Sequence, residues 1–178
     1  MKKYEKYNRK LNRLIDYNYS NPSDYFITIC TKNRMCLFGY MENEIMNLNG
    51  FGKIVKKCWL EIPDHFNNIY LDEYIIMPNH IHGIITILGD ENDNNRIGNA
   101  DLRSLRDRTK MLLPKIIHGF KSSVTRKINK KYNNSHEIWQ KSYYDHIIRS
   151  EKSLNNIRDY TINNPVMWNE DRNNPKFS

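Results

Sequence analysis

Two histidines stand two residues apart in an apolar run over residues 77–87, MPNHIHGIITI. Side chains alternate between the faces of a β-strand, so His80 and His82 would share one face while Ile81 and Ile85 point toward a core. Two imidazoles whose Cα atoms are about 6 to 7 Å apart on a strand can bind one metal ion. Such a pair also occurs as ordinary surface or core histidines, so a metal site needs a third ligand and a reacting group.

The two residues before the histidine strand indicate a turn. Pro78 has no N–H for a β-ladder and Asn79 is a common turn residue, so strand pairing should break there. We expect residues 69–77 and 79–87 to form either an antiparallel pair of strands or one long bent strand. The break would leave the histidines at an accessible strand end.

A predicted helix near the end of the chain carries two further candidate residues. Ser150 is a favourable N-cap, Glu151 suits the positive end of the helix dipole, and Pro165 ends the helix. Tyr160 and Asn164 are four residues apart and are therefore neighbours on one helical face. Asn164 should leave helical geometry because it precedes a proline. A helical tyrosine is more often part of the core or its rim, so this pair alone does not establish a catalytic site.

Other segments must position these groups. β-branched and aromatic residues predict a buried strand over residues 25–31. Apolar residues at helical spacing predict an amphipathic helix over residues 49–66, ending near Pro63. A second amphipathic helix is predicted within residues 103–131, and part of the aromatic stretch 138–148 should form the last strand.

The charge of the chain indicates a polyanionic partner. It has 28 Lys and Arg against 20 Asp and Glu, a net charge of +8, and an isoelectric point of about 9.3, which favours nucleic acid over a membrane. Residues 103–131 contain ten basic residues and one acidic residue, a local balance of +9. The polar face of this helix would carry Lys115, Lys121, Arg126, Lys127, Lys130 and Lys131. A merely solvated face is the alternative, but the one-sided sign of the charge favours phosphate contacts.

Length and composition indicate a single cytoplasmic domain. A chain of 178 residues that is 39% hydrophobic can bury a sizeable core. No apolar run approaches the roughly 20 residues that cross a bilayer, and the basic N-terminus leads into no apolar signal segment. The three cysteines, Cys30, Cys36 and Cys58, lack the spacing of a disulfide framework or a thiolate zinc site.

Two polar segments lie outside this predicted core. Residues 1–24 combine basic residues with interleaved tyrosines, which suits a nucleic-acid-binding arm as well as a solvated extension packed on the domain. Residues 89–99 are nearly all Asp, Asn, Glu and Gly, which predicts a mobile loop after the histidine strand. The acidic residues from Asp90 to Asp93 would repel DNA beside the site.

Five blocks of the sequence, spread over nearly the whole chain, keep the order found in a known family. They are YFITICTKNR at 25–34, LFG at 37–39, MPNHIHGI at 77–84, WQKSYYDHIIR at 139–149 and DYTINNPV at 159–166. The sequence resembles the single-tyrosine HUH transposases, and within them the REP-associated tyrosine transposases. HUH denotes histidine, hydrophobic residue, histidine, which here are His80, Ile81 and His82.

The resemblance implies an α+β fold of the HUH endonuclease type. This is a ferredoxin-like (RRM-like) antiparallel sheet with helices packed on one face, and the predicted order of strands and helices agrees with it. The domain would occupy residues 25–168, between a basic arm (1–24) and a tail (169–178). The implied partner is single-stranded DNA with a hairpin, bound by a monomer or a homodimer.

The resemblance also implies roles for the candidate residues. Tyr160 would be the nucleophile, and Asn164 would join His80 and His82 as the third ligand of a divalent ion, Mg²⁺ or Mn²⁺. Two neutral imidazoles and an amide oxygen would leave positions on the ion for phosphate oxygens and water. The ion would polarise a scissile phosphate for in-line attack by the tyrosine, which forms a covalent 5′-phosphotyrosine intermediate.

The DNA contacts and two alternative functions complete the interpretation. Beside the basic helix, Trp139, Tyr143 and Tyr144 could provide stacking platforms, or could equally belong to the core. A non-catalytic RRM-like module for single-stranded DNA or RNA would need neither metal nor tyrosine. A zinc hydrolase would use His80, His82 and a ligand such as His146, with water as the attacking group.

Overall fold

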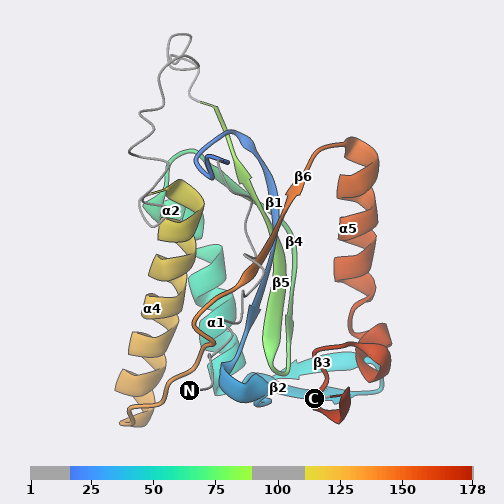
Figure 1. Cartoon of the computed structure of the whole chain (residues 1–178). Helices are drawn as coiled ribbons and strands as arrows, with labels where there is room; N and C mark the ends of the chain where they lie inside the picture. Colours follow the sequence, from blue (N-terminus) through green and yellow to red (C-terminus); the bar gives the residue numbers. More distant parts are fainter. Residues whose placement is uncertain (1–16, 90–110, 178) are drawn as a thin grey trace, which may run out of the picture.

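A four-stranded antiparallel sheet lies at the centre of the computed structural model, which describes residues 17–89 and 111–177. In spatial order the strands are β4 (Ile69–Met77), β5 (His80–Ile87), β1 (Ser23–Cys30) and β6 (Tyr144–Ile148) (Figure 1). Each lies where the sequence predicts a strand. Pro78 and Asn79 form the turn between β4 and β5, which confirms the antiparallel pair.

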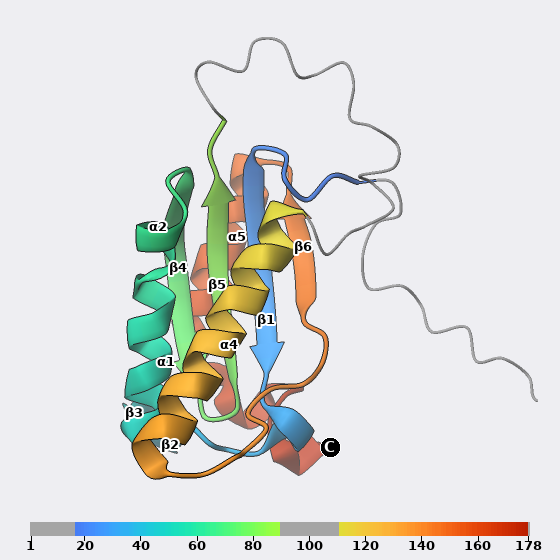
Figure 2. The same cartoon turned by 90° about the vertical axis from the view of Figure 1, so that its left-hand side faces the viewer.

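Helices cover both faces of this sheet. The helices α1 (Gly50–Leu60), α2 (Ile62–His65) and α4 (Leu112–Tyr132) lie on one side, and α5 (Glu151–Asn163) lies on the other (Figures 1 and 2). The expectation that the helices share one face is therefore wrong for α5. Phe26, Ile84 and Ile148 form a second apolar cluster on the α5 side, and Leu154 and Ile157 of α5 pack against it.

The larger core fills the space between the sheet and the layer of α1 and α4. Trp59 of α1 is fully buried there, with its ring edge toward Phe120 of α4 at a centroid distance of 5.4 Å. The same ring lies against Gly83 of β5, where a Cβ atom would stand 2.3 Å from it. The apolar stripe predicted on α4 is buried as expected: Leu113, Ile116, Ile117, Phe120, Val124 and Ile128.

Side-chain caps and a proline set the helix limits. The Asn49 side chain accepts hydrogen bonds from two N–H groups at the start of α1, and Ser150 caps α5 as predicted. The helix predicted over residues 49–66 is divided into α1 and α2 close to Pro63, which has no N–H to donate to the preceding turn.

Several short elements were not predicted. The strands β2 (Gly39–Glu42) and β3 (Ile45–Leu48) form a hairpin whose turn residues Asn43 and Glu44 have positive φ values of 49° and 62°. The chain also contains the 3-10 helices η1 (Lys32–Arg34), η3 (Val166–Glu170) and η4 (Pro175–Phe177). A lone 3-10 turn has no distinctive sequence period, so the spacing of apolar residues does not predict it.

The end of α5 differs from the prediction in one respect. Asn164 keeps right-handed helical geometry, with φ −57° and ψ −36°, so the expectation that the following proline displaces it is wrong. Instead of ending in an extended segment, the chain continues through Pro165 into η3. This continuation returns residues 171–174 to the end of the sheet at which β5 begins.

Some expectations fall outside the described residues. These are residues 1–16 of the basic arm, 90–99 of the predicted loop and 103–110 of the basic segment. Tyr17 and Tyr19, at the end of the arm, pack against the larger core. The limits of the predicted domain, 25–168, stay a prediction.

Candidate metal centre

His80 and His82 lie on the face of β5 that α5 covers. Ile81 and Ile85 point to the larger core on the opposite face, which confirms the predicted alternation. The two imidazoles are 4.5 Å apart between centroids. The expectation of an accessible strand end is wrong, because His80 and His82 are only 0% and 1% exposed.

The Asn79 side chain determines which nitrogen of His80 faces the site. Its amide nitrogen donates to the carbonyls of Arg34 (3.0 Å) and Asn173 (2.7 Å), so its oxygen must be the atom that meets His80 Nδ1, at 2.8 Å. An amide oxygen only accepts, so Nδ1 carries the proton. His80 Nε2 is therefore left with a free lone pair.

His82 is held in a matching way. Its Nδ1 lies 2.8 Å from the Thr28 hydroxyl on the neighbouring strand β1, and Phe26 stacks on its ring at 5.3 Å. Its Nε2 faces α5, where the Tyr160 hydroxyl lies 3.3 Å away. Both histidines are thus fixed through Nδ1 and present Nε2 to one space between β5 and α5.

Asp171 and Asn164 complete this space. Ligand atoms of His80, His82 and Asp171 all lie within 4.8 Å of one another. One Asp171 oxygen, Oδ2, is 3.6 Å from His80 Nε2 and accepts a hydrogen bond of 3.2 Å from the Asn164 amide nitrogen. The other oxygen accepts from the Asn173 N–H at 2.6 Å. All four side chains are buried.

Burial governs the protonation of these groups. Loss of hydration lowers the pKa of His80 to about 3, although the nearby Asn164 amide opposes the shift, and it lowers the pKa of His82 well below its usual value. Both imidazoles are neutral at physiological pH. Burial raises the pKa of Tyr160, with a further contribution from the negative charge of Asp171. The Tyr160 hydroxyl is therefore protonated as well.

The arrangement fits a bound cation. The Nε2 lone pair of the neutral His80 imidazole faces the Asp171 carboxylate. A lone pair and a negative charge that face each other in a dry site repel, which is unfavourable. Within residues 17–89 and 111–177, the buried His80 Nε2 and Asn164 Oδ1 have no hydrogen-bond partner. Two imidazole nitrogens, an amide oxygen and a carboxylate are suitable ligands for a divalent ion such as Mn²⁺ or Mg²⁺.

Asp171 is the site residue that sequence reasoning missed. The sequence predicts an uncharged site of two imidazoles and one amide, and the structure adds a carboxylate from the segment expected to be a tail. Asp171 lies in a polar run, NEDRNN, without helical or strand periodicity. Only the path of the chain through η3 brings it to the histidines.

The three tyrosines considered for catalysis lie in different environments. Tyr160 is on α5, next to His82 and one helical turn before Asn164. Tyr143 is buried in the larger core, on the opposite side of the sheet from the histidines. Tyr144 is on β6 and faces the histidine side, but it is 43% exposed and makes no hydrogen bond to the site among the described residues.

His146 does not join the metal cluster. It is exposed on β6, opposite Phe26 of β1. Within the described residues, the third acidic or histidine ligand is Asp171. The geometry therefore places no third imidazole beside His80 and His82.

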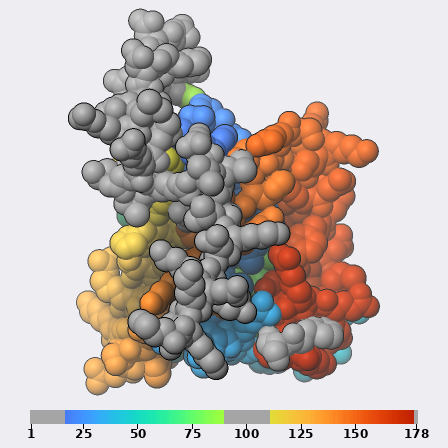
Figure 3. All heavy atoms as spheres, viewed as in Figure 1, coloured from blue at the N-terminus to red at the C-terminus, as the bar shows by residue number. Residues whose placement is uncertain are grey.

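The predicted basic residues of α4 fall into two groups. The Lys121 ammonium donates to the carbonyls of Gln140 (2.6 Å) and Lys141 (3.1 Å), and Lys127 forms an ion pair with Glu61 at 2.6 Å. The remaining predicted contacts, Lys115, Arg126 and Lys130, are exposed. Figures 1 and 3 show α4 and α5 on opposite sides of the molecule, and the candidate metal centre lies on the α5 side of the sheet.

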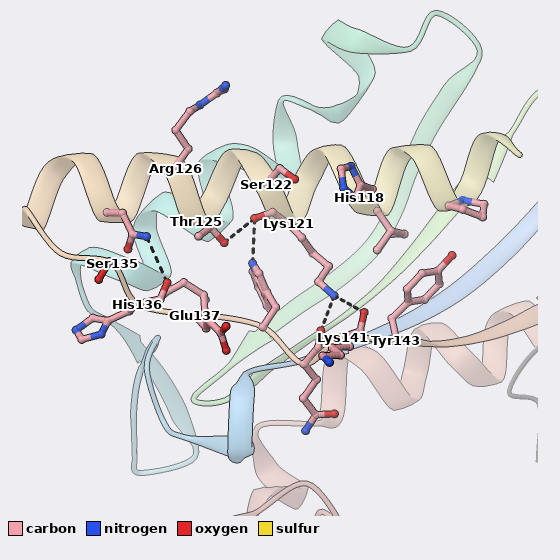
Figure 4. A pocket seen from close by; sticks show the side chains of 16 residues that line it. His118, Lys121, Ser122, Thr125, Arg126, Ser135, His136, Glu137, Lys141 and Tyr143 are labelled. Atoms are coloured by element: carbon pink, nitrogen blue, oxygen red, sulfur yellow. Dashed lines mark hydrogen bonds between the residues drawn. The ribbon is translucent and has the colours of Figure 1, made fainter. Parts of the chain in front are cut away.

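A groove of about 890 Å³ runs between α4 and residues 135–143 (Figure 4). His118, Ser122 and Arg126 from α4 and Lys141 from the facing segment supply polar groups to its walls. Trp139, a predicted stacking platform, is mostly buried beneath the groove: its ring contacts Phe38 and Phe120 at 5.2 and 5.6 Å, and its N–H donates to the Lys121 carbonyl.

Comparison with known proteins identifies similar chains. This chain is 41% identical over 169 residues to an uncharacterised protein of Haemophilus influenzae, and the alignment covers 93% of each protein. It is 37% identical over 142 residues to a Haemophilus influenzae protein assigned to the REP-associated tyrosine transposases, which covers 80% of this chain and 69% of that protein. No protein-family model matches the chain.

One solved structure has the same fold. A REP-associated tyrosine transposase bound to a REP hairpin superposes with a TM-score of 0.54 and 18% identity, over 94% of this chain and 74% of that one. The likeness confirms the α+β HUH fold class. None of the helices within residues 17–89 and 111–177 combines the length and apolar character needed to cross a bilayer.

We predict that Asp171→Asn lowers the affinity for Mn²⁺ about tenfold or more, because it removes the carboxylate of the cluster. Asn164→Ala should weaken binding less, since water can replace an amide oxygen. Glu170→Gln, at an exposed neighbouring position, is the matched control and should leave the affinity unchanged. Titration calorimetry measures all three. An unchanged affinity in Asp171→Asn would remove Asp171 from the ligand set.

Proposed function

The chain belongs to the family of REP-associated tyrosine transposases, and from this membership we propose that it is a metal-dependent enzyme that cuts and rejoins single-stranded DNA. Its substrate would be a repeat that folds into a hairpin, as in the related protein bound to a REP hairpin. Cleavage would proceed through a covalent 5′-phosphotyrosine intermediate on Tyr160.

The position of the Tyr160 hydroxyl, 3.3 Å from His82 Nε2, is the observation that carries this proposal. A nucleophile acts efficiently when it is held beside the group that activates the substrate. Tyr160 and Asn164 project from the same helix, so the element that presents the nucleophile also completes the candidate metal centre. The Phe26 ring meets Tyr160 edge-on at 6.1 Å and restricts its rotation.

The proposed step exchanges one phosphodiester for another. The Tyr160 oxygen forms a bond to phosphorus, and the bond between phosphorus and the 3′ oxygen breaks. The phenol releases one proton and the 3′ oxygen takes one up, so no proton is gained or lost overall. A free 3′ hydroxyl can later attack the phosphotyrosine, which retains the bond energy, so no nucleotide cofactor is required.

The buried polar groups have distinct roles in this step. His80, His82, Asn164 and Asp171 would hold a divalent cation, Mg²⁺ or Mn²⁺, whose positive charge would stabilise the phosphate as negative charge develops. The Asn79 amide oxygen fixes the tautomer of His80, and the Thr28 hydroxyl holds the His82 ring in its orientation. The Tyr160 phenol has a raised pKa in the free protein, so ionisation has to be promoted when substrate binds.

The basic groove beside α4 would hold the phosphate backbone of the DNA. Arg126, His118 and Lys141 line this groove, and Lys115 and Lys130 are exposed on α4 outside its lining. Lys121 and Lys127 contribute charge to the same region while their ammonium groups are bound within the protein. A merely solvated basic face would have several acidic side chains beside it. Among the described residues, the acidic neighbours of this surface are Glu61 and Glu137.

We predict that Tyr160→Phe binds hairpin DNA but forms no covalent adduct in the presence of Mn²⁺, because the change removes the attacking oxygen and little else. Tyr143→Phe and Tyr144→Phe are matched controls that should keep adduct formation within about tenfold. A denaturing gel followed by peptide mapping measures the result. An adduct on another tyrosine, or a 3′-phosphate linkage, would contradict the assignment. Binding without any adduct in the unaltered protein would favour a binding-only module.

We predict that binding of single-stranded hairpin DNA weakens steeply with salt, and that Arg126→Ala reduces the slope of log K against log salt concentration by about one unit. Lys127→Ala is the control, since this ammonium is already paired with Glu61 and its loss should change the slope less. Fluorescence anisotropy at several salt concentrations gives both slopes. An unchanged slope in Arg126→Ala would indicate that the basic face of α4 is merely solvated and does not contact DNA phosphates.

A further inference from the structure

Tyr144 lies between the α4 groove and the metal centre. Tyr143, at the preceding position, lines the groove and belongs to the larger core. Because side chains alternate along β6, Tyr144 points to the other side of the sheet, where the histidines lie. The segment from Gln140 to Tyr144 therefore leads around the edge of the sheet, from the groove to the metal centre.

The strand register gives the distance of Tyr144 from the site. Thr28 of β1 pairs with Tyr144 on one side and with His82 on the other, so the three residues form one row across the sheet. Neighbouring strands are about 4.8 Å apart, which places the Cα atoms of Tyr144 and His82 about 10 Å from each other. The Tyr144 ring is 43% exposed, whereas Trp139 and Tyr143 are each 9% exposed.

Two arginines border the Tyr144 ring and the metal cluster. The Arg172 guanidinium carbon lies 5.9 Å from the centre of the Tyr144 ring, and Arg172 follows the candidate ligand Asp171 directly. The Arg34 guanidinium donates to the Arg172 carbonyl at 2.6 Å, so a second positive charge stands nearby.

We infer that Tyr144 and Arg172 form a binding platform for the unpaired nucleotide that adjoins the phosphate cut at the metal centre. An exposed aromatic ring can stack on any base, and a guanidinium can stack beside it while it contacts a phosphate. The opposite charge of the DNA backbone and the continuity with the groove identify the occupant as single-stranded DNA. This inference rests on the proposed function and adds to it residues that position the substrate.

The test uses two DNA probes with protein that carries Tyr160→Phe, so that no cleavage occurs. One probe is a bare REP hairpin, the kind of DNA bound in the related solved structure. The other is the same hairpin with its single-stranded flank, which carries 2-aminopurine beside the cleaved phosphate. We expect Tyr144→Ala and Arg172→Ala each to weaken binding of the flanked hairpin about tenfold and to leave the bare hairpin unaffected.

Matched variants separate stacking from nonspecific effects. Tyr144→Phe should retain binding and the stacking-induced quenching of 2-aminopurine, because the ring remains. Tyr70→Ala alters an exposed tyrosine on β4, at the opposite edge of the sheet, and should have no effect. Unchanged binding of the flanked hairpin in Tyr144→Ala and Arg172→Ala, or equal losses for both probes, would overturn this inference alone. If protein that carries Tyr160→Phe alone binds neither probe, the proposed function and this inference are both overturned.

Discussion

Two neutral imidazoles and a carboxylate converge in a buried space, and the arrangement of the C-terminal third of the chain depends on this convergence. His80 and His82 are each held at Nδ1 by a neighbouring polar side chain, so their Nε2 atoms must face inward. Asp171 meets them there. His80 Nε2 faces the Asp171 carboxylate at 3.6 Å with no donor between the two atoms, which is unfavourable in a dry site. A bound cation would remove that cost, and in the proposed function it would also supply the positive charge for phosphoryl transfer.

The two faces of the sheet carry different tasks. One face packs on α1 and α4 and supplies the hydrophobic core, with Trp59 against Gly83 at its centre. The other face carries the candidate metal centre under α5, and its small apolar cluster around Phe26 anchors that helix. An ion pair between Arg158 and Asp72, at a bulge of β4, ties α5 to the edge of the sheet and holds the pKa of Asp72 below its usual value. In the proposed function, single-stranded DNA would bind the basic face and reach the candidate metal centre around β6.

Local sequence patterns predicted the helices and strands, whereas the site also depends on how the chain folds back in three dimensions. Three features depend only on neighbours in sequence and were predicted correctly. They are the strand that places His80 and His82 on one face, the apolar stripe of α4 and the Ser150 cap. The continuous apolar run of β1 is typical of a strand covered on both faces, a signal for the position of α5 that the fold expectation did not use. Asp171 depends on how η3 turns the chain back, and the intramolecular bonds of Lys121 depend on a segment twenty residues away, so neither could be derived from a local pattern.

Anomalous diffraction from crystals grown with Mn²⁺ tests the central claim most directly. The account predicts one manganese peak between β5 and α5, at about 2.0 to 2.3 Å from Nε2 of both histidines and from an Asp171 oxygen, with the Tyr160 hydroxyl beside it. A peak bound through Nδ1, a peak that excludes Asp171, or no peak at saturating Mn²⁺ would contradict it.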